Sequence, residues 1–228
     1  MANQAELVRS FGALAIRVSR LDTDGAPDPG ELNSAYNMRP VRVNREPQTT
    51  TGQRFEAIDG SGEVCASKQA RDTVTGETLT VELCQFDMET IEIMTGAELI
   101  LDPGAPTVVI GLKAPDPEIS TPATEFNAWS EARLLDGTAA EPYLHWVWPS
   151  VEWSLAATNL EAGFLTVQLT GNAQSNSNIG NGAFNDFPEE LDRFWNVFLA
   201  SDIPDPTQAP YNEFGLSGGY IDTPADAS

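Results

Sequence analysis

The sequence predicts a mainly β fold, an antiparallel β-sandwich or barrel with one or two short helices. Apolar and polar residues alternate strictly at 78–83 and again at 165–170, and this period places the aliphatic side chains on one face of a strand. Gly-containing pairs such as Asp24-Gly25 and Thr75-Gly76 separate the runs and are typical of turns. Many short strands between turns favour a sandwich or a barrel.

Four further segments fit strands. Residues 14–18 alternate in the same way, and 107–112 form a short apolar run that suits a more buried strand. Residues 126–134 and 143–148 follow, and the second of these carries two Trp residues on one side. The expected sheet therefore draws on both halves of the chain.

Helical spacing occurs at two places. Residues 87–94 begin with Asp87, a residue type that caps helices, and Gly96 follows as a stop signal. In 188–199 apolar residues recur every three or four positions after an initial proline, which predicts a second helix packed on the sheet.

The remaining composition predicts loops and one boundary. Residues 22–30 are rich in Gly, Pro and Asp, 44–54 are expected to form a loop between two strands, and 174–182 are polar throughout. We expect a β domain over 1–200 and a Pro/Gly/Asp-rich C-terminal arm over 201–228.

Charge restricts the function. The chain has 34 acidic and 12 basic residues, a formal charge of -22. Such a balance repels phosphates and anionic lipid surfaces, and it excludes a DNA reader, an RNA-binding module and a peripheral membrane protein. The first residues lack the pattern of a signal peptide, and no apolar run approaches the ~20 residues of a membrane span.

The search for chemistry finds no catalytic motif. His145, the one histidine, lies inside a strand candidate and is expected to be a packed residue, because a metal site needs further ligands. The sequence has neither a nucleophile elbow nor a phosphate-binding loop. We therefore expect no enzyme, no cofactor and no metal. Cys65 and Cys84 are expected to be reduced, packed thiols.

Three stretches resemble a known family. Residues 11–25 run from Phe-Gly through a strand with a basic residue to Leu-Asp-Thr-Asp-Gly. Residues 60–96 pass from Gly-Ser-Gly-Glu-Val-Cys through a strand ending in Glu-Leu-Cys to an acidic cap and a helix that ends in Thr-Gly. With 164–172, which end in Leu-Thr-Gly-Asn, this succession is similar to the major tail proteins, the tail-tube subunits, of actinobacteriophages with siphovirus tails.

The resemblance implies a structural virion protein of the phage tail-tube fold. It implies self-assembly into stacked, hexameric rings that form the viral tail tube, a negatively charged conduit for DNA ejection. The implied partners are further copies of the chain and the tape-measure and tail-terminator proteins, while genomic double-stranded DNA passes through without specific binding and no membrane takes part. The implied location is the virion tail, after synthesis in the host bacterial cytoplasm.

A tube subunit needs a polar strand face toward its lumen, and two alternating strands supply candidates. Six copies at -22 would bring about -132 charges to one ring, which would repel passing DNA from the wall. The alternative is that these faces meet bulk solvent. The lumen-facing candidates are Thr78, Thr80, Glu82, Thr166, Gln168 and Thr170.

Ring stacking needs complementary surfaces on the two ends of a ring. A cluster of arginines in the N-terminal part of a chain whose C-terminal half is almost purely acidic is a candidate for one end. If so, reversing Arg42 and Arg45 to Glu blocks tube growth and leaves the subunit folded; the alternative is that these arginines flank a loop and pair locally. The ring-stacking candidates are Arg39, Arg42, Arg45 and Arg54.

Two other classes of function stay open. A carbohydrate-binding β-sandwich or adhesin would use an exposed Trp cluster as a stacking platform, whereas a tube subunit should bury most of its Trp. A hydrolase would pair carboxylates from the set Glu131, Glu141 and Glu152 near that cluster. Another tail component, such as a tail terminator or a connector, would share the fold without forming a tube.

Overall fold

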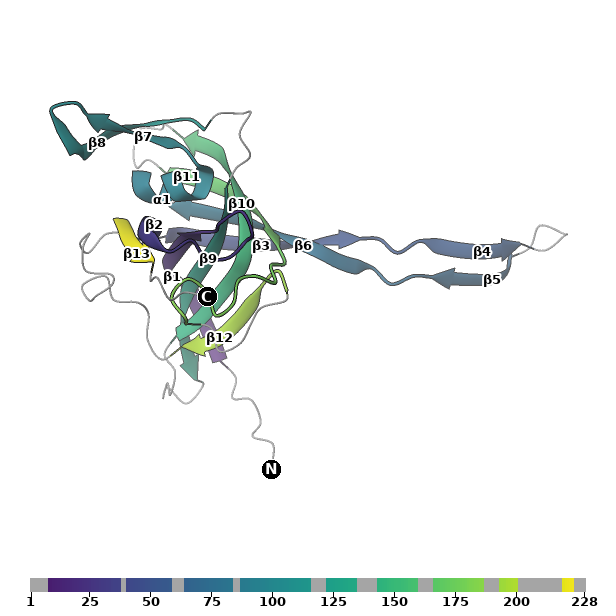
Figure 1. Ribbon diagram of the computed structural model, residues 1–228. Coiled ribbons are helices and arrows are strands. Elements are labelled where there is room, and N and C mark those ends of the chain that lie inside the picture. Colours follow the sequence, from purple (N-terminus) through teal and green to yellow (C-terminus); the bar gives the residue numbers. More distant parts are fainter. Residues whose placement is uncertain are drawn as a thin grey trace.

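The computed structural model of the chain is mainly β and antiparallel, as the alternation predicts (Figure 1). In the part of the chain that the structure describes, thirteen strands accompany one helix. The described residues are 8–37, 40–58, 64–83, 87–115, 122–134, 143–159, 166–186, 193–200 and 219–223.

A nine-stranded sheet forms the body of the molecule. Its strands follow the order β13-β2-β1-β9-β10-β11-β6-β3, and β12 pairs with β10 outside this path. The nine strands are β1 (Val8–Arg20), β2 (Gly30–Asn37), β3 (Pro40–Thr50), β6 (Thr73–Leu83), β9 (Ala123–Leu134), β10 (Tyr143–Asn159), β11 (Thr166–Gln174), β12 (Asn196–Ala200) and β13 (Gly219–Thr223).

The long strand β10 joins two halves of this sheet. Its first part lies between β9 and β12, and its later part pairs with β11. The register with β9 shifts between Trp148 and Val151, around Pro149, and such an irregularity bends a strand. The sheet curls so that β3, at one end of the order, lies close to β1 and Val43 packs against the core.

The main core fills the inside of this curl. It unites the apolar positions of the alternating strands, among them Leu79 and Val81 of β6 and Val167 and Leu169 of β11. The helix α1 (Met88–Thr95) adds Ile91, Ile93 and Met94. Burial of these side chains is the main stabilising contribution to the fold.

The helix agrees with its sequence prediction. Asp87 lies at the N-cap position, where its carboxylate accepts hydrogen bonds from the side chains of Thr90 and Asn37 instead of a backbone cap bond. Gly96 ends the helix in the left-handed conformation, with φ 68°, and its N–H donates to Glu92 O. A side chain at this position would be strained and would meet Pro122.

The outer face of β1, β9 and the first part of β10 is also buried. The segment 175–186 lies over it and contributes Ile179 and Phe184 to two smaller apolar clusters. Asn176 holds this segment in place, because its Nδ2 donates to Gly25 O at 2.7 Å and to Pro149 O at 3.2 Å. After β11 ends at Gln174, the polar stretch 174–182 is thus a loop that is anchored to the sheet through Asn176 and the buried Ile179, while several of its residues remain exposed.

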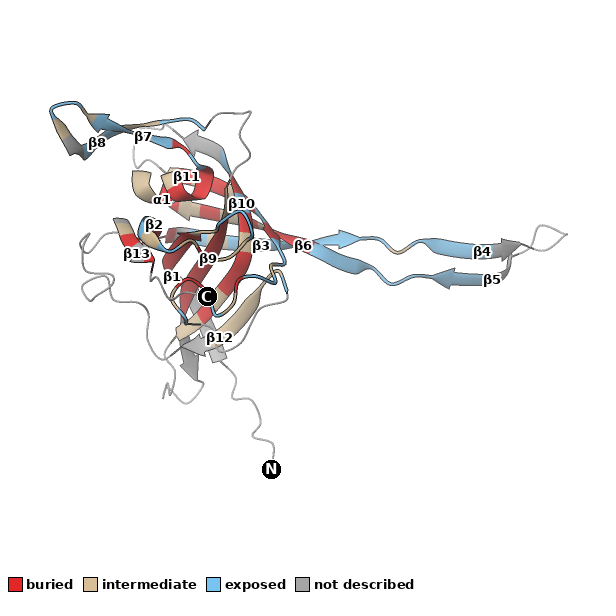
Figure 2. Cartoon of the chain, in the orientation of Figure 1, coloured by how far each residue is buried: buried red, intermediate tan, exposed pale blue. Residues whose placement is uncertain are grey.

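Two hairpins project from the body on opposite sides in Figure 1. The long hairpin, residues 48–58 and 64–75, continues β3 and β6 outward into β4 (Arg54–Ile58) and β5 (Val64–Gln69). The short hairpin consists of β7 (Glu98–Asp102) and β8 (Ala105–Lys113). Figure 2 shows that most of the described length of both is exposed.

Three sequence predictions of local structure are wrong. β3 extends to Thr50, so the expected loop 44–54 is mainly strand. Thr75-Gly76 is no turn: Gly76 lies inside β6, where a Cβ would come within 3.3 Å of the backbone oxygen of Ala173. The expected helix 188–199 is a strand over its last residues, β12, because the edge of β10 offers it a hydrogen-bonding partner.

The C-terminal region contributes to the sheet. Within the expected arm 201–228, β13 pairs with β2 and places Ile221 in a core cluster. Ser34 Oγ and Thr223 Oγ1 lie 2.6 Å apart in a buried hydrogen bond.

In the described part of the chain, no helix is both long and apolar enough to cross a membrane.

Candidate assembly surfaces

The lumen-facing candidates lie together on one sheet face. Antiparallel neighbours share a face, and the register pairs Glu82 with Gln168 and Thr80 with Thr170. Thr78 lies opposite Asn172, and Thr166 continues the same side of β11. All six candidates are half-buried.

This surface, which we call the polar face, extends over four strands. β3 adds Arg42, Asn44 and Glu46 beside Glu82, Thr80 and Thr78. β10 adds Glu152 and Ser154, which lie opposite Asn172 and Thr170. The apolar residues that alternate with these positions on β6 and β11 point to the other side, into the main core.

Hydrogen bonds and ion pairs tie the strands of the polar face together. Gln48 Nε2 donates to Thr78 Oγ1 at 2.7 Å and to Asn172 Oδ1 at 3.3 Å, across three strands. Arg42 Nη2 lies 2.9 Å from Glu82 Oε2. The positive charge of Arg42 on the polar face is therefore paired with the carboxylate of Glu82, its register partner on β6.

The described ring-stacking candidates all have carboxylate partners within the chain. Besides Arg42, Arg54 Nη2 lies 2.6 Å from Glu56 Oε1 on the long hairpin, and Arg45 Nη1 lies 3.3 Å from Glu77 Oε1. Arg39 lies outside the described residues. Arg42 and Arg54 are more than half exposed, at 52% and 65%, so their weak surface pairs leave them accessible to another chain.

Arg45 differs from the other two because it lies on the core side of β3, at the edge of the core, with 39% of its side chain still exposed. Its position in β3 pairs with the core residue Leu79, and its guanidinium lies over the ring of Trp195 at 4.2 Å and over that of Trp146 at 5.1 Å. Glu77, which is 2% exposed, also accepts a hydrogen bond from Trp148 Nε1 at 2.7 Å. Arg45 is thus part of the fold.

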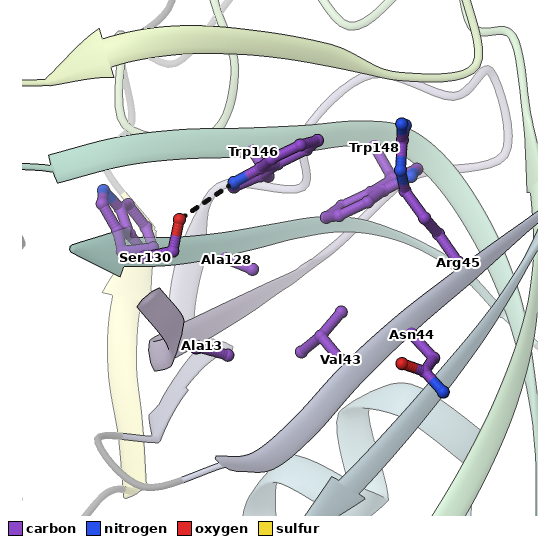
Figure 3. A pocket seen from close by; sticks show the side chains of 10 residues that line it. Ala13, Val43, Asn44, Arg45, Ala128, Ser130, Trp146 and Trp148 are labelled. Carbon is purple, nitrogen blue, oxygen red and sulfur yellow. Dashed lines mark hydrogen bonds between the residues drawn. The ribbon is translucent and has the colours of Figure 1, made fainter. Parts of the chain in front are cut away.

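An aromatic cavity of about 360 Å³ opens beside this arginine, where β1 and β3 approach each other (Figure 3). Trp146 and Trp148 form one wall with stacked rings 6.3 Å apart, and Trp146 Nε1 donates to Ser130 Oγ at 3.2 Å. Val43 and Ala13 face them from the neighbouring strands.

The tryptophans are packed to different degrees. Trp129, Trp148 and Trp153 are at most 2% exposed, whereas Trp146 and Trp195 are half-buried. Because Arg45 covers the two half-buried rings, they do not form a bare stacking platform. Three of the five Trp side chains therefore serve the core, as a tube subunit would require.

A buried polar cluster lies under the covering segment 175–186. Arg17 and Glu125, both without exposed side-chain surface, form an ion pair at 3.3 Å, and Asp186 approaches Arg17 Nη2 to 2.9 Å. Asn127 Nδ2 donates to Glu125 Oε1, so Asn127 Oδ1 is left to accept from His145 Nε2 at 2.8 Å. These bonds connect β1, β9 and β10 to the cover.

Burial determines the protonation of this cluster. It raises the pKa of Glu125, and the charge of Arg17 opposes that rise. Burial lowers the pKa of His145 to about 4, so the ring is neutral at pH 7 and stacks on Trp129 at 4.4 Å. His145 is the packed histidine that the sequence predicts.

The sequence-predicted carboxylates are not assembled into one described site. Glu152 is exposed on the polar face, Glu141 lies outside the described residues, and the side chain of Glu131 is likewise not described. Among the described residues, no group of three His, Cys, Asp or Glu side chains is placed to hold a metal ion. The thiols of Cys65 and Cys84 are outside the described side chains.

Sequence reasoning missed two surfaces. The apolar run near 107–112 was expected to be a buried strand, but Val108 and Ile110 of β8 are about half exposed. The length of the long hairpin was missed because its Gly and Thr content is typical of a loop.

Comparison of the chain with models of known protein families and with curated proteins finds no match.

Proposed function

We propose that this chain is the major tail-tube subunit of a long-tailed bacteriophage, which assembles into stacked rings around a channel for DNA. The observation that carries the proposal is the long hairpin. An isolated two-stranded hairpin is marginally stable in water, and the described side chains of this one are exposed from Thr49 to Gln69 except at Gly52. A partner chain that covers it accounts for its length.

The polar face supports the second half of the proposal. It is a broad surface of small hydroxyl, amide and carboxylate groups in which Arg42 is matched by Glu82. Within a chain of net charge -22, such a surface offers DNA phosphates no free cation among its described residues. We assign it to the lumen, with further copies of the chain, a tape-measure protein and a tail terminator as partners in the virion tail.

A shortened variant tests the role of the long hairpin. Thr50 and Thr73 are a register pair, so replacement of 51–72 by Asn-Gly closes β3 and β6 with a two-residue turn. Since no described residue of that segment belongs to a core cluster, the body should keep its melting temperature within about 5 °C.

The assembly readout is sedimentation velocity over a range of protein concentrations. The full chain should sediment as large assemblies and the shortened variant as a monomer or a single ring. Assembly of the shortened variant into species as large as those of the full chain would contradict the proposal that the hairpin joins copies.

A further inference from the structure

The short hairpin carries a concentration of exposed apolar side chains. Ile100 and Leu101 of β7 are each 45% exposed, and Val108 and Ile110 of β8 are 48% and 56% exposed. Leu112 near the base packs against the main core, so the hairpin is rooted in the body. Clustered aliphatic groups held in water at the end of a projection mark an interaction surface.

The charge of this hairpin is small for such an acidic protein. Glu98 and Lys113 at its base form an ion pair at 2.6 Å, and Asp102 near the tip is the remaining ionised residue. Another copy of a chain with charge -22 meets less repulsion here than on most of the body.

The long hairpin has similar properties. Over residues 48–75 the sequence has three cations and four acids, a net charge of only -1 in a chain of charge -22. The hairpin also exposes apolar side chains, with Phe55 60% and Val74 45% exposed. The two hairpins therefore both carry little net charge and share exposed apolar groups.

Their placement excludes a contact within one molecule. The long and short hairpins leave the body on opposite sides (Figure 1), so they can meet only between two copies. A contact between two different surfaces is heterologous, and it repeats from copy to copy into a ring or a filament.

We infer that the short hairpin is the docking surface for the long hairpin of a second copy. Ile100, Val108 and Ile110 cover Phe55 and its neighbours, and the low net charge of both hairpins keeps the repulsion between two copies of charge -22 small at this contact. This inference rests on the self-assembly in the proposed function and names the surface that performs it.

Threonine substitutions test the contact with little risk to the strands, because Thr has the branched Cβ that favours β structure. The acceptor variant is Ile100→Thr with Ile110→Thr, and the donor variant is Phe55→Thr. The matched control is Leu155→Thr, which removes a side chain that is 47% exposed on β10. Each is compared with the full chain by sedimentation velocity and electron microscopy.

The acceptor and donor variants should each raise the protein concentration needed for assembly about tenfold or more, since each removes apolar side-chain area from the contact. The control should assemble like the unchanged chain. To establish that the contact is direct, a benzophenone amino acid at position 110 should cross-link to peptides from 48–58 or 64–75 of another copy.

The outcomes separate this inference from the proposed function. Unchanged assembly of the acceptor variant, or cross-links only to other segments, overturns the docking surface and leaves the tube intact. If both variants lose assembly and the expected cross-link forms, the contact is supported. If the assemblies of the full chain nevertheless lack a channel, the tube is overturned. A full chain that remains monomeric overturns both.

Discussion

Arg45 shows how one residue can be assigned to the wrong surface from sequence. It lies among basic residues that suggest an intermolecular patch, yet its side chain is on the core side of β3, between two Trp rings and the buried Glu77. The neighbouring Arg42, three residues earlier, is on the opposite face with an exposed pair. Because successive side chains of a strand point to opposite faces, two residues that are three positions apart lie on different faces of the sheet.

This difference separates the two arginines in a stability measurement. Arg45→Glu should lower the free energy of unfolding by about 2 kcal/mol or more, because it removes the cation–π contacts and adds a second carboxylate beside Glu77. Arg42→Glu should cost less than about 1 kcal/mol, as an exposed pair does. Denaturant unfolding of both variants measures this.

Arg45→Met is the control that retains the aliphatic stem and should fall between the two. Equal losses for Arg42→Glu and Arg45→Glu would contradict the position of Arg45 on the core side of β3. Because Arg45→Glu is also expected to lower stability, Arg42→Glu alone is the cleaner test of ring stacking.

At the scale of elements, the sequence pattern predicts those strands and helices whose conformation depends on neighbouring residues in the chain. The strands at 78–83 and 165–170 and the helix at 87–94 follow from period and capping, and the structure confirms them. β12 could not be predicted this way, because its conformation depends on the edge of β10, more than 40 residues earlier in the chain. The polar face could be predicted strand by strand, but its continuity across β3 required the register.

The buried cluster under segment 175–186 predicts how this element responds to acid. The folded-state pKa of His145 is lowered to about 4, below its ordinary value near 6.5, so the unfolded chain binds a proton first as pH falls. The neutral ring therefore contributes stability that is present above pH 6.5 and lost toward pH 4. Glu125, with its raised pKa, acts in the opposite direction, and Arg17 and Asp186 face both.

His145→Gln isolates the histidine, since its amide nitrogen can still donate to Asn127. The stability advantage of the unchanged chain over this variant should shrink by up to about 3 kcal/mol between pH 7 and pH 4.5. Denaturant unfolding at the two pH values measures the gap. A gap that stays constant would show that His145 does not titrate between the folded and unfolded states.

At the scale of the whole molecule, the body and the two hairpins differ in how far their side chains are buried. The nine-stranded sheet has its own core and buries both faces of one half, whereas the polar face and the two hairpins remain open to solvent. Long exposed strands are sites at which another chain can pair. The self-association that we propose gives these surfaces a common purpose.

Negative-stain electron microscopy of the purified full chain, over a series of protein and salt concentrations, tests this account most directly. Salt screens the repulsion between copies of charge -22 and should promote assembly. The account predicts stacked rings or tubes with a central channel. Monomers under every condition, or assemblies without an axial channel, would contradict it.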